Sequence, residues 1–439
     1  MKLTKLRQAT AAVTIATLAT ALAACGSSGP TSGAAGSAGA SAWALTGGDE
    51  QTFRTSFDAW NKTNPTETIT PTFLSNDAFK QKVRTAIGAG KGPSLIYGWG
   101  GGILKAYVDA GQVADLTDDV NADPALKSRF LPSIAATGII AGKVYAIGNN
   151  AMQPVVLFYN KDVFTKAGIE PPTTFDGLLA VIPKLKAAGV APLALGGQSK
   201  WPDLMWEEYL VDRIGGPEVF DKIAANKPDA WSDPAVLEAN TKIQQLVGAG
   251  AFVKGFSSIA ADSGADLALL YTGKAAMLLQ GSWNYPTLKT ANPQFLKDGK
   301  LGFIPFPAVT GGKGDPKDVA GNPANFWSVS SKASAGEKKA ALDYLKKGVM
   351  SDDYVDALLK GGAVPPVAGL QSKLAATQDP QWLSYVYALA QQAPHFQLSW
   401  DQALSPVQAD ALLTNLDKLF LTQITPEQFS TAMNKTVGK

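Results

Sequence analysis

Two reactive residue types are almost absent from this chain of 439 residues, which has one cysteine and one histidine. A single cysteine cannot form an internal disulfide, and one histidine leaves no His/Cys set for a metal ion. A Ser-His-Asp or Cys-His arrangement would have only His395 as its base, and this residue lies between Pro394 and Phe396, a context typical of a loop or surface histidine. We therefore predict no catalytic residue of these kinds, no metal and no cofactor.

The chain also lacks an excess of charge of either sign. Its 39 Lys+Arg stand against 37 Asp+Glu, and Lys2, Lys5 and Arg7 precede every acidic residue. The remainder is close to neutral, so the electrostatics of a phosphate backbone cannot drive binding, and we predict no nucleic-acid partner. With 46% apolar and 17% charged residues, the chain can bury the cores of two or more lobes.

The small and apolar run at the N-terminus is too short to cross a bilayer as a helix. It spans residues 11–24, whereas a transmembrane helix needs roughly 20 residues. Together with the preceding cations, it is typical of a secretory signal peptide. The run ends in Leu22-Ala23-Ala24-Cys25, which resembles the bacterial lipobox, where the cysteine is acylated; an ordinary signal peptide with a chance cysteine is the alternative. We expect residues 1–24 to be a lipoprotein signal peptide, Cys25 the lipidation site, and residues 25–41 a flexible tether to the membrane.

Motifs for common enzyme chemistry are missing as well. Residues 197–201 lack the last glycine of a nucleophile elbow, and residues 98–103 fail the dinucleotide fingerprint at its final position. Paired carboxylates, as in a glycosidase, remain the only enzymatic option, and any chain with 37 acids offers such pairs. The case for an enzyme is weak.

What the chain does contain is an alternation of strand and helix patterns. Residues 42–46, 68–74, 94–97 and 154–159 read as strands, separated by stretches with helical spacing. Thr174 is expected to cap a helix, and Ser334 with Glu337 forms a capping-box pattern. The pattern predicts α/β lobes with mixed sheets, while the C-terminal third reads as mostly helical, without strand signals.

Tryptophan is the second notable feature, with ten residues in the chain. Five of them lie next to glycine, proline or polar residues, where a core position would be unusual: Trp99, Trp201, Trp283, Trp327 and Trp400. An indole face at a strand end or loop can stack on the C–H patches of a sugar, and neighbouring amides and carboxylates can bind its hydroxyls. Four others lie on or beside helical stretches and are interpreted as packing residues: Trp60, Trp206, Trp231 and Trp382.

Four segments, in this order, resemble the family-1 extracellular solute-binding lipoproteins that deliver carbohydrates to ABC importers. They are the first-helix ending Trp60-Asn61 with Pro65, the strand entry 89–96, the stretch 157–175, and residues 275–283. Ser94 stands where the family usually has Asp. The resemblance covers nearly the whole chain after residue 43.

The resemblance implies a type II binding-protein fold of two α/β lobes, joined by a three-segment hinge, with the ligand in the cleft. It places the crossings near 150–156, 303–307 and 351–360. The N-terminal lobe then comprises 42–152 and 308–352, and the C-terminal lobe 153–307 and 353–439.

The resemblance also implies where the ligand is bound. Trp99 corresponds to a stacking tryptophan on the first lobe and Trp283 to one on the second. Gln153, at the hinge, stands where relatives often have a carboxylate, which suggests a contact to a neutral hydroxyl. The remaining positions that the resemblance assigns to the cleft are Trp201, Asp203, Asn76, Asp49, Asn150, Trp400 and Asp401. For Asn76, Asp49 and Asn150, a role as turn-former or cap is equally open.

These observations favour a membrane-anchored receptor, facing out of the cytoplasm, for a di- or oligosaccharide. The Ala- and Gly-rich composition favours xylo- or cello-oligosaccharides, and the expected partners are the membrane permease subunits of an ABC importer. We expect a monomer. A surface lipoprotein glycosidase and a binding protein for a charged solute, such as a polyamine or peptide, remain alternatives.

Overall fold

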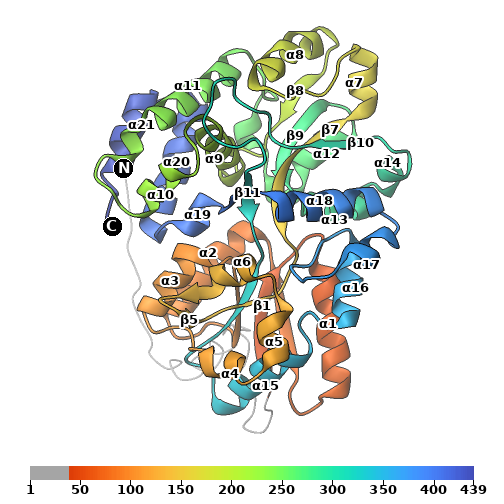
Figure 1. The fold of residues 1–439 in the computed structure, drawn as a ribbon, viewed down its shortest axis with the longest axis vertical. Coiled ribbons are helices and arrows are strands. Elements are labelled where there is room, and N and C mark those ends of the chain that lie inside the picture. Colours follow the sequence, from red (N-terminus) through yellow and green to blue (C-terminus); the bar gives the residue numbers. More distant parts are fainter. Residues whose placement is uncertain (1–38) are drawn as a thin grey trace, which may run out of the picture. The chain divides into compact units, whose positions relative to one another are not determined.

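The computed structural model describes residues 39–439, which form two mixed β-sheets with helices around them (Figure 1). The predicted signal peptide, the lipidation site Cys25 and nearly all of the predicted tether lie outside the described residues. We call the part of the chain built on the first sheet the first lobe, and the part built on the second sheet the second lobe.

The sheet of the first lobe has five strands in the order β2-β1-β3-β12-β6. The strands are β1 (Ala40–Leu45), β2 (Ile69–Leu74), β3 (Leu95–Gly98), β6 (Ile147–Gly148) and β12 (Phe326–Val329). β1 is parallel to β2 and β3, whereas β12 is antiparallel to β3 and β6. A small hairpin of β4 (Ile139–Ile140) and β5 (Lys143–Val144) lies apart from this sheet.

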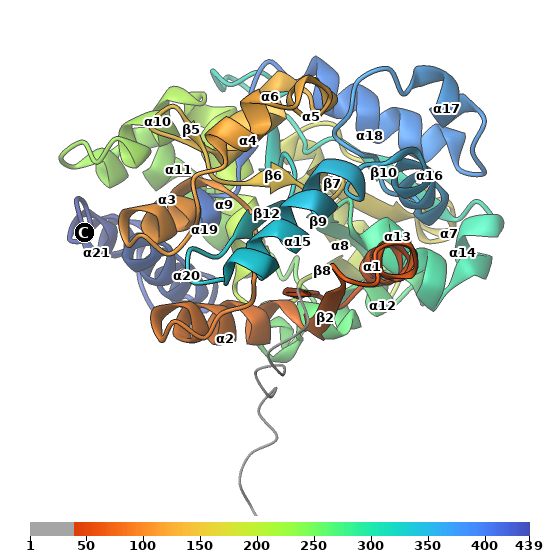
Figure 2. The same ribbon diagram turned by 90° about the horizontal axis from the view of Figure 1, so that it is seen from below.

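The helices of the first lobe are α1 (Glu50–Thr63), α2 (Asn76–Gly88), α3 (Gly101–Asp109), α4 (Thr117–Asn121), α5 (Pro124–Arg129), α6 (Pro132–Ala135), α15 (Ala335–Lys347), α16 (Asp352–Gly361) and α17 (Gln371–Ala375). Of these, α1, α2 and α15 pack directly against the sheet. Phe53, Phe57 and Trp60 are the buried residues of α1, at helical spacing. α15 packs against β1 and β12 (Figure 2) and begins with the predicted capping box of Ser334 and Glu337.

The sheet of the second lobe has the order β13-β11-β7-β9-β8, and β10 also pairs with β7. Its strands are β7 (Gln153–Asn160), β8 (Ala191–Ala194), β9 (Ala275–Gly281), β10 (Leu301–Ile304), β11 (Val319–Asn322) and β13 (Phe396–Leu398). Every residue of β7 except Tyr159 is buried, as expected for an apolar run in a central strand.

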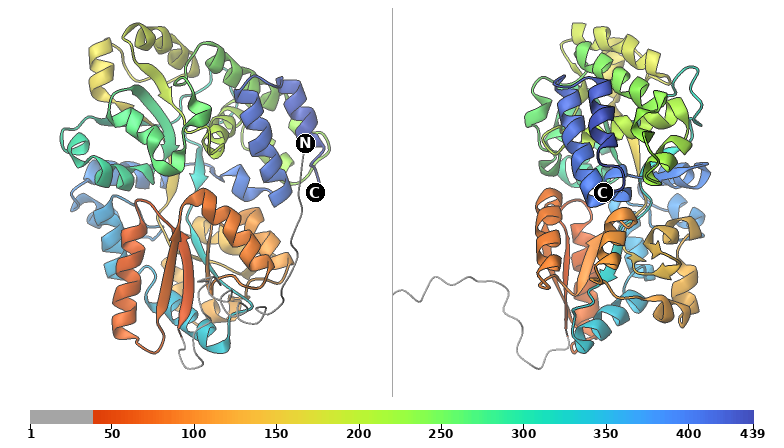
Figure 3. Two further views of the ribbon diagram at one scale, coloured as in Figure 1. Left: turned by 180° about the vertical axis from the view of Figure 1, so that it is seen from behind. Right: turned by 90° about the vertical axis from the view of Figure 1, so that its left-hand side faces the viewer.

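Twelve helices surround this second sheet. They are α7 (Lys161–Ala167), α8 (Phe175–Ala187), α9 (Trp201–Gly215), α10 (Glu218–Ala224), α11 (Pro234–Gly248), α12 (Ala265–Tyr271), α13 (Asn284–Ala291), α14 (Pro293–Lys297), α18 (Pro380–Gln392), α19 (Trp400–Ala403), α20 (Pro406–Phe420) and α21 (Pro426–Asn434). The Thr174 hydroxyl caps α8 by accepting the Gly177 N–H at 3.0 Å, as predicted. The C-terminal helices α20 and α21 pack against α11, where Figure 3 shows blue beside green.

The chain passes between the two sheets three times, and only the first crossing lies where it was predicted. It runs from β6 to β7, through residues 149–152. The second lies between β11 and β12, at residues 323–325, because both β10 and β11 are strands of the second sheet. The third crossing lies between α17 and α18. Up to α17 the chain stays beside the first lobe, because α16 packs on α1 and Val364 and Val367 form β-bridges with Met152 and Phe130.

The predicted lobe segments therefore need correction. Residues 308–322 belong to the second lobe, and residues 353–375 belong to the first. The first strand begins at Ala40, two residues inside the predicted tether. The C-terminal third is also not free of strands, since β10, β11, β12 and β13 all lie within it.

Candidate ligand-binding cavity between the two lobes

A cavity lies between the two lobes, at the carboxyl ends of several strands. It is lined by the loop after β1, the residues after β3 and β9, the first crossing, the start of α9, and α19. The carboxyl ends of strands are where open α/β sheets bind ligands. The space amounts to about 1120 Å³ with its open mouth included.

Three tryptophans from the two lobes line this cavity. Trp99 follows β3 in the first lobe and packs edge-on against Tyr97, with ring centroids 5.4 Å apart. Trp201 begins α9 and Trp283 follows β9 in the second lobe, and their ring centroids lie 6.0 Å apart. A Cβ on Gly281 would fall 1.9 Å from the Trp283 ring, so only glycine leaves room for this indole position. The three rings offer apolar surface that both lobes contribute to one site.

Amide side chains form the polar part of the cavity wall. Asn150, in the first crossing, donates its Nδ2 to the Asp49 carboxylate at 3.0 Å. Asn322, at the end of β11, donates to Gln153 Oε1 at 3.3 Å. Asn76, at the start of α2, also lines the cavity and donates to Asp77 at 3.0 Å. The predicted residues Asp49, Asn76, Asn150 and Gln153 are thus brought together here.

Three buried polar atoms of the lining residues have no hydrogen-bond partner among the described residues. They are the indole Nε1 of Trp201, the amide Nδ2 of Asn284 and the carbonyl Oδ1 of Asn322. Each of these atoms has almost no accessible surface, so it can bind a ligand or water only when its side chain moves. Two are donors and one is an acceptor, and a hydroxyl group can serve either kind.

The charged groups of the cavity are mostly carboxylates. Burial raises the pKa of Asp49 to about 6, and the hydrogen bond from Asn150 opposes part of this shift. Glu50 is held by Arg54 at 2.6 Å, and Asp401 by Lys80 at 2.9 Å. Asp262, in the turn before α12, accepts the backbone N–H of Asp77 at 2.8 Å, and burial raises its pKa. Glu50, Asp262 and Lys80 were not expected from the sequence, where no motif marks them.

Three predicted site residues do not line the cavity. Trp327 is fully buried within β12 and contacts Phe53 edge-on at 5.8 Å. Trp400 is 1% exposed, because its ring stacks on Phe220 with centroids 4.5 Å apart. Asp203 has no exposed surface, and burial raises its pKa well above the usual range. We therefore withdraw all three as ligand contacts, whereas Asp401 and Gln402, the neighbours of Trp400, do line the cavity. Trp60, Trp206, Trp231 and Trp382 are buried, as predicted.

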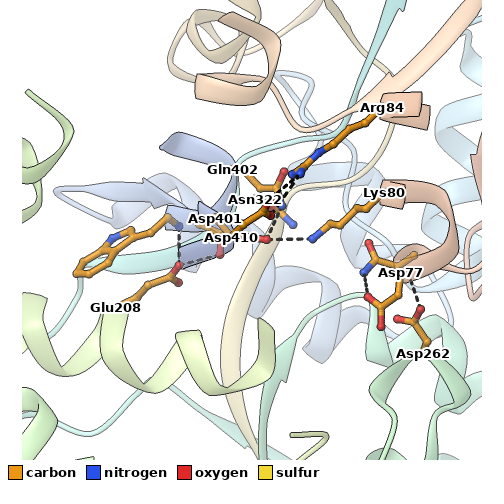
Figure 4. Close-up of polar contacts among 12 residues, drawn as sticks. Asp77, Lys80, Arg84, Glu208, Asp262, Asn322, Asp401, Gln402 and Asp410 are labelled. Carbon is orange, nitrogen blue, oxygen red and sulfur yellow. Dashed lines mark hydrogen bonds and ion pairs between the residues drawn. The ribbon is translucent and has the colours of Figure 1, made fainter. Parts of the chain in front are cut away.

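One face of α2 holds the two lobes together beside the cavity (Figure 4). Three residues at helical spacing on this face contact carboxylates of the second lobe. The backbone N–H of Asp77 donates to Asp262, and ion pairs join Lys80 to Asp401 and Arg84 to Asp410, the last at 3.1 Å. Next to them, a Cβ on Gly102 at the start of α3 would lie 2.3 Å from the Leu404 carbonyl oxygen, so the glycine allows α3 to approach α19 closely. The structure is therefore one in which the lobes are in contact around the cavity.

Within residues 39–439, no cluster of three or more His, Cys, Asp or Glu side chains could hold a metal ion. The helices of the same residues include none that is both long and apolar enough to cross a membrane.

The family model for bacterial extracellular solute-binding proteins matches residues 43–347 of this chain. This chain belongs to that family. Among its relatives, an uncharacterized ABC transporter extracellular-binding protein of Pyrococcus horikoshii is 30% identical over 281 residues, covering 61% of this solute-binding protein and 59% of the relative. A probable sugar-binding periplasmic protein of Mesorhizobium japonicum is 34% identical over 154 residues, 35% of this chain and 36% of that protein. The matched region therefore spans less than two thirds of either relative.

Solved structures confirm the two-lobe type II fold of this solute-binding protein. A structure from work on xylan utilization by Caldanaerobius polysaccharolyticus has a TM-score of 0.81 and 30% identity, with 91% of this chain and all of that chain covered. A chitin oligosaccharide binding protein has a TM-score of 0.80 at 24% identity, covering 91% of this chain and 98% of that one, which shows the shared fold alone.

Proposed function

We propose that this protein is the substrate-binding component of an ABC importer and that it binds a di- or oligosaccharide in the cavity between its lobes. The observation that carries the proposal is the shared cavity of Trp99 from the first lobe and Trp201 with Trp283 from the second. Tryptophan rings supply apolar faces for the C–H surfaces of sugar rings. Amide side chains that also line the cavity, those of Asn76 and Asn150, supply donors and acceptors for hydroxyls.

The number of indoles in the cavity wall supports a ligand larger than one sugar ring. Three indoles match two or more rings better than one. A xylo- or cello-oligosaccharide fits this description, and the similarity to a structure from work on xylan utilization supports that choice.

Binding would act through closure of the lobes. The polar contacts of α2 with the second lobe form only when the two sheets approach each other. A ligand that touches both lobes binds the closed arrangement better than the open one and shifts a pre-existing equilibrium toward it. The closed arrangement would then be the form that the importer's permease subunits recognise.

The chain before residue 39 would attach the protein to the membrane. Acylation of Cys25 would hold the protein at the outer face of the cell membrane, and the following Gly- and Ser-rich residues would tether it there. The protein would act as a monomer without chemistry of its own.

Intrinsic tryptophan fluorescence tests the proposal directly, since three indoles line the cavity. The protein would be titrated with xylo-, cello-, malto- and chito-oligosaccharides, with a polyamine and a short peptide as other classes of ligand. We expect saturable binding of at least one oligosaccharide series and no release of dye from chromogenic glycosides. Binding of none of the sugars, or turnover of a glycoside, would contradict the proposal.

A cationic solute is the second candidate, because four carboxylates but one ammonium group line the cavity: Asp49, Glu50, Asp262, Asp401 and Lys80. Two of these acids already have a cationic partner, and Asp262 accepts a backbone N–H. Among residues 39–439, the Asp49 carboxylate accepts a hydrogen bond from the neutral Asn150 amide alone, so it would be the group that pairs with a cationic ligand. Saturable binding of the polyamine with no response to any sugar would favour this function instead.

A further inference from the structure

A second cavity adjoins the first, and the two share part of their walls. The shared residues are Lys80, Tyr97, Trp99, Asp401 and Gln402. With its open side included, the second cavity measures about 1160 Å³. The wall between them is therefore a place where the length of a bound chain could be set.

An ion pair of two residues from different lobes is part of this shared wall. Lys80 Nζ, from α2, lies 2.9 Å from the Asp401 carboxylate of α19, and Gln402 Nε2 donates to the same carboxylate at 2.6 Å (Figure 4). The Asp401 side chain is 7% exposed and that of Lys80 23%. Lys80 Nζ also lies 5.2 Å from the Trp99 ring centroid, so the ammonium stands beside an indole of the first cavity.

The second cavity has the side chains that a sugar ring needs. Tyr107, on α3, is partly buried and offers an aromatic face, while Gln198 and Ser199, in the loop before α9, offer an amide and a hydroxyl. Its outer rim carries the Arg84–Asp410 pair, whose side chains are 37% and 66% exposed. As in the first cavity, the two lobes both contribute to the lining.

We propose that the Lys80–Asp401 pair determines the length of the bound oligosaccharide by closing the first cavity against the second, and that the second cavity is a further sugar subsite. This inference rests on the proposed function. Short chains bind within the first cavity with the pair intact. A longer chain passes into the second cavity only if the pair separates, which leaves a nearly buried carboxylate without its cation and therefore weakens binding.

The role of the pair is tested by truncating the Lys80 side chain and measuring whether the protein prefers longer or shorter oligosaccharides. Lys80→Ala removes one partner of the pair from the shared wall, whereas Lys82→Ala removes the same charge from the same helix at a position that faces Trp43, with Nζ 4.8 Å from that ring. Both variants and the unmodified protein would be titrated by calorimetry with xylo-oligosaccharides of two to six rings. The readout is the Kd of the two-ring sugar divided by the Kd of the six-ring sugar. A variant that only hinders lobe closure raises both Kd values by the same factor and leaves this ratio unchanged.

We expect Lys80→Ala to raise this ratio about tenfold, because the added rings gain the stacking surface of the second cavity, and Lys82→Ala to leave it unchanged. A double variant, Lys80→Ala with Tyr107→Ala, should lose most of the gain. An unchanged ratio in Lys80→Ala, with binding of two rings retained, would overturn the role of the pair. Absence of binding to every sugar in all proteins would overturn the proposed function, and this inference with it.

Discussion

The side-chain amide of Asn150 donates to the carboxylate of Asp49 at 3.0 Å, and this bond connects the first crossing between the lobes to the loop before α1. Asp49 has no cationic partner within the described residues, and burial raises its pKa to about 6. Its protonation state therefore changes in the physiological range, in the wall of the proposed sugar site.

Sugar affinity should depend on pH through Asp49. A hydroxyl that donates to this group favours the ionised carboxylate, so affinity is highest well above the pKa of about 6 and falls as the pH drops through 6. If only the ionised form binds, affinity at pH 5 should be about tenfold lower than at pH 7. Calorimetric titration at the two pH values measures this change.

Asp49→Asn serves as the control for that profile. It removes the titrating group and keeps the shape of the side chain, so the variant should bind with little difference between the two pH values. A variant with the same pH dependence as the unmodified protein would assign the effect to another group.

Closure should be sensitive to the size of residue 102. A Cβ on Gly102 would lie 2.3 Å from the Leu404 carbonyl oxygen and 2.5 Å from that of Ala403, and backbone atoms cannot move aside without moving the lobe. Gly102→Ala should therefore hinder full closure and weaken sugar binding by about fivefold or more, because overpacking costs about 1–3 kcal/mol. Small-angle scattering with saturating sugar should show a larger radius of gyration than for the unmodified protein.

Gly88→Ala is the matched control, since it adds the same methyl group at the end of α2, with no atom within 4 Å of the new Cβ. It should leave both affinity and the radius of gyration unchanged. If Gly102→Ala behaves in the same way as Gly88→Ala, the approach of α3 to α19 does not limit closure.

Glu208 should make folding stability depend on pH. Its carboxylate accepts the Trp400 backbone N–H at 2.6 Å and the Ser399 hydroxyl at 2.8 Å, yet burial raises its pKa to about 8. The folded state thus holds a proton that the unfolded chain releases above pH 4.5, so the free energy of unfolding falls between pH 4.5 and about 8. The ceiling of this loss is about 5 kcal/mol, at 1.36 kcal/mol for each pH unit.

Glu208→Gln should remove this loss while keeping an oxygen that accepts both hydrogen bonds. Chemical denaturation at pH 5 and pH 8 should show that the free energy of unfolding declines less for the variant than for the unmodified protein. The control is Glu218→Gln, at an exposed position of α10, whose free energy of unfolding should decline as much as that of the unmodified protein. Equal declines in all three proteins would show that Glu208 does not hold the proton.

The fold could be predicted where a local pattern is strong. The apolar run at 154–159 became the central strand β7, and the Ser334–Glu337 pattern became a capping box. β11, by contrast, is the four-residue segment Val319–Asn322 with a glycine inside, and neither its length nor its composition marks a strand. Because that strand decides which sheet the chain is in, the second crossing was predicted some twenty residues too early.

The site was predictable only in part, for a similar reason. Trp99 and Trp283 follow strands and neighbour glycines, and both line the cavity. Trp327 has a comparable polar neighbourhood, yet it lies within a central strand and is fully buried. Lys80 and Asp262 acquire their partners only through the approach of the two lobes, so no pattern along the chain marks them.

Whether indoles of both lobes hold a sugar is decided by the calorimetric affinity of Trp99→Ala and Trp283→Ala for the best sugar found. Trp400→Phe, which changes a core tryptophan outside the cavity, is the control. Stacking in an enclosed site contributes about 1–3 kcal/mol. We therefore predict that each alanine variant loses about tenfold or more in affinity and that Trp400→Phe loses little. Affinities within about twofold of the unmodified protein for both alanine variants would contradict the account.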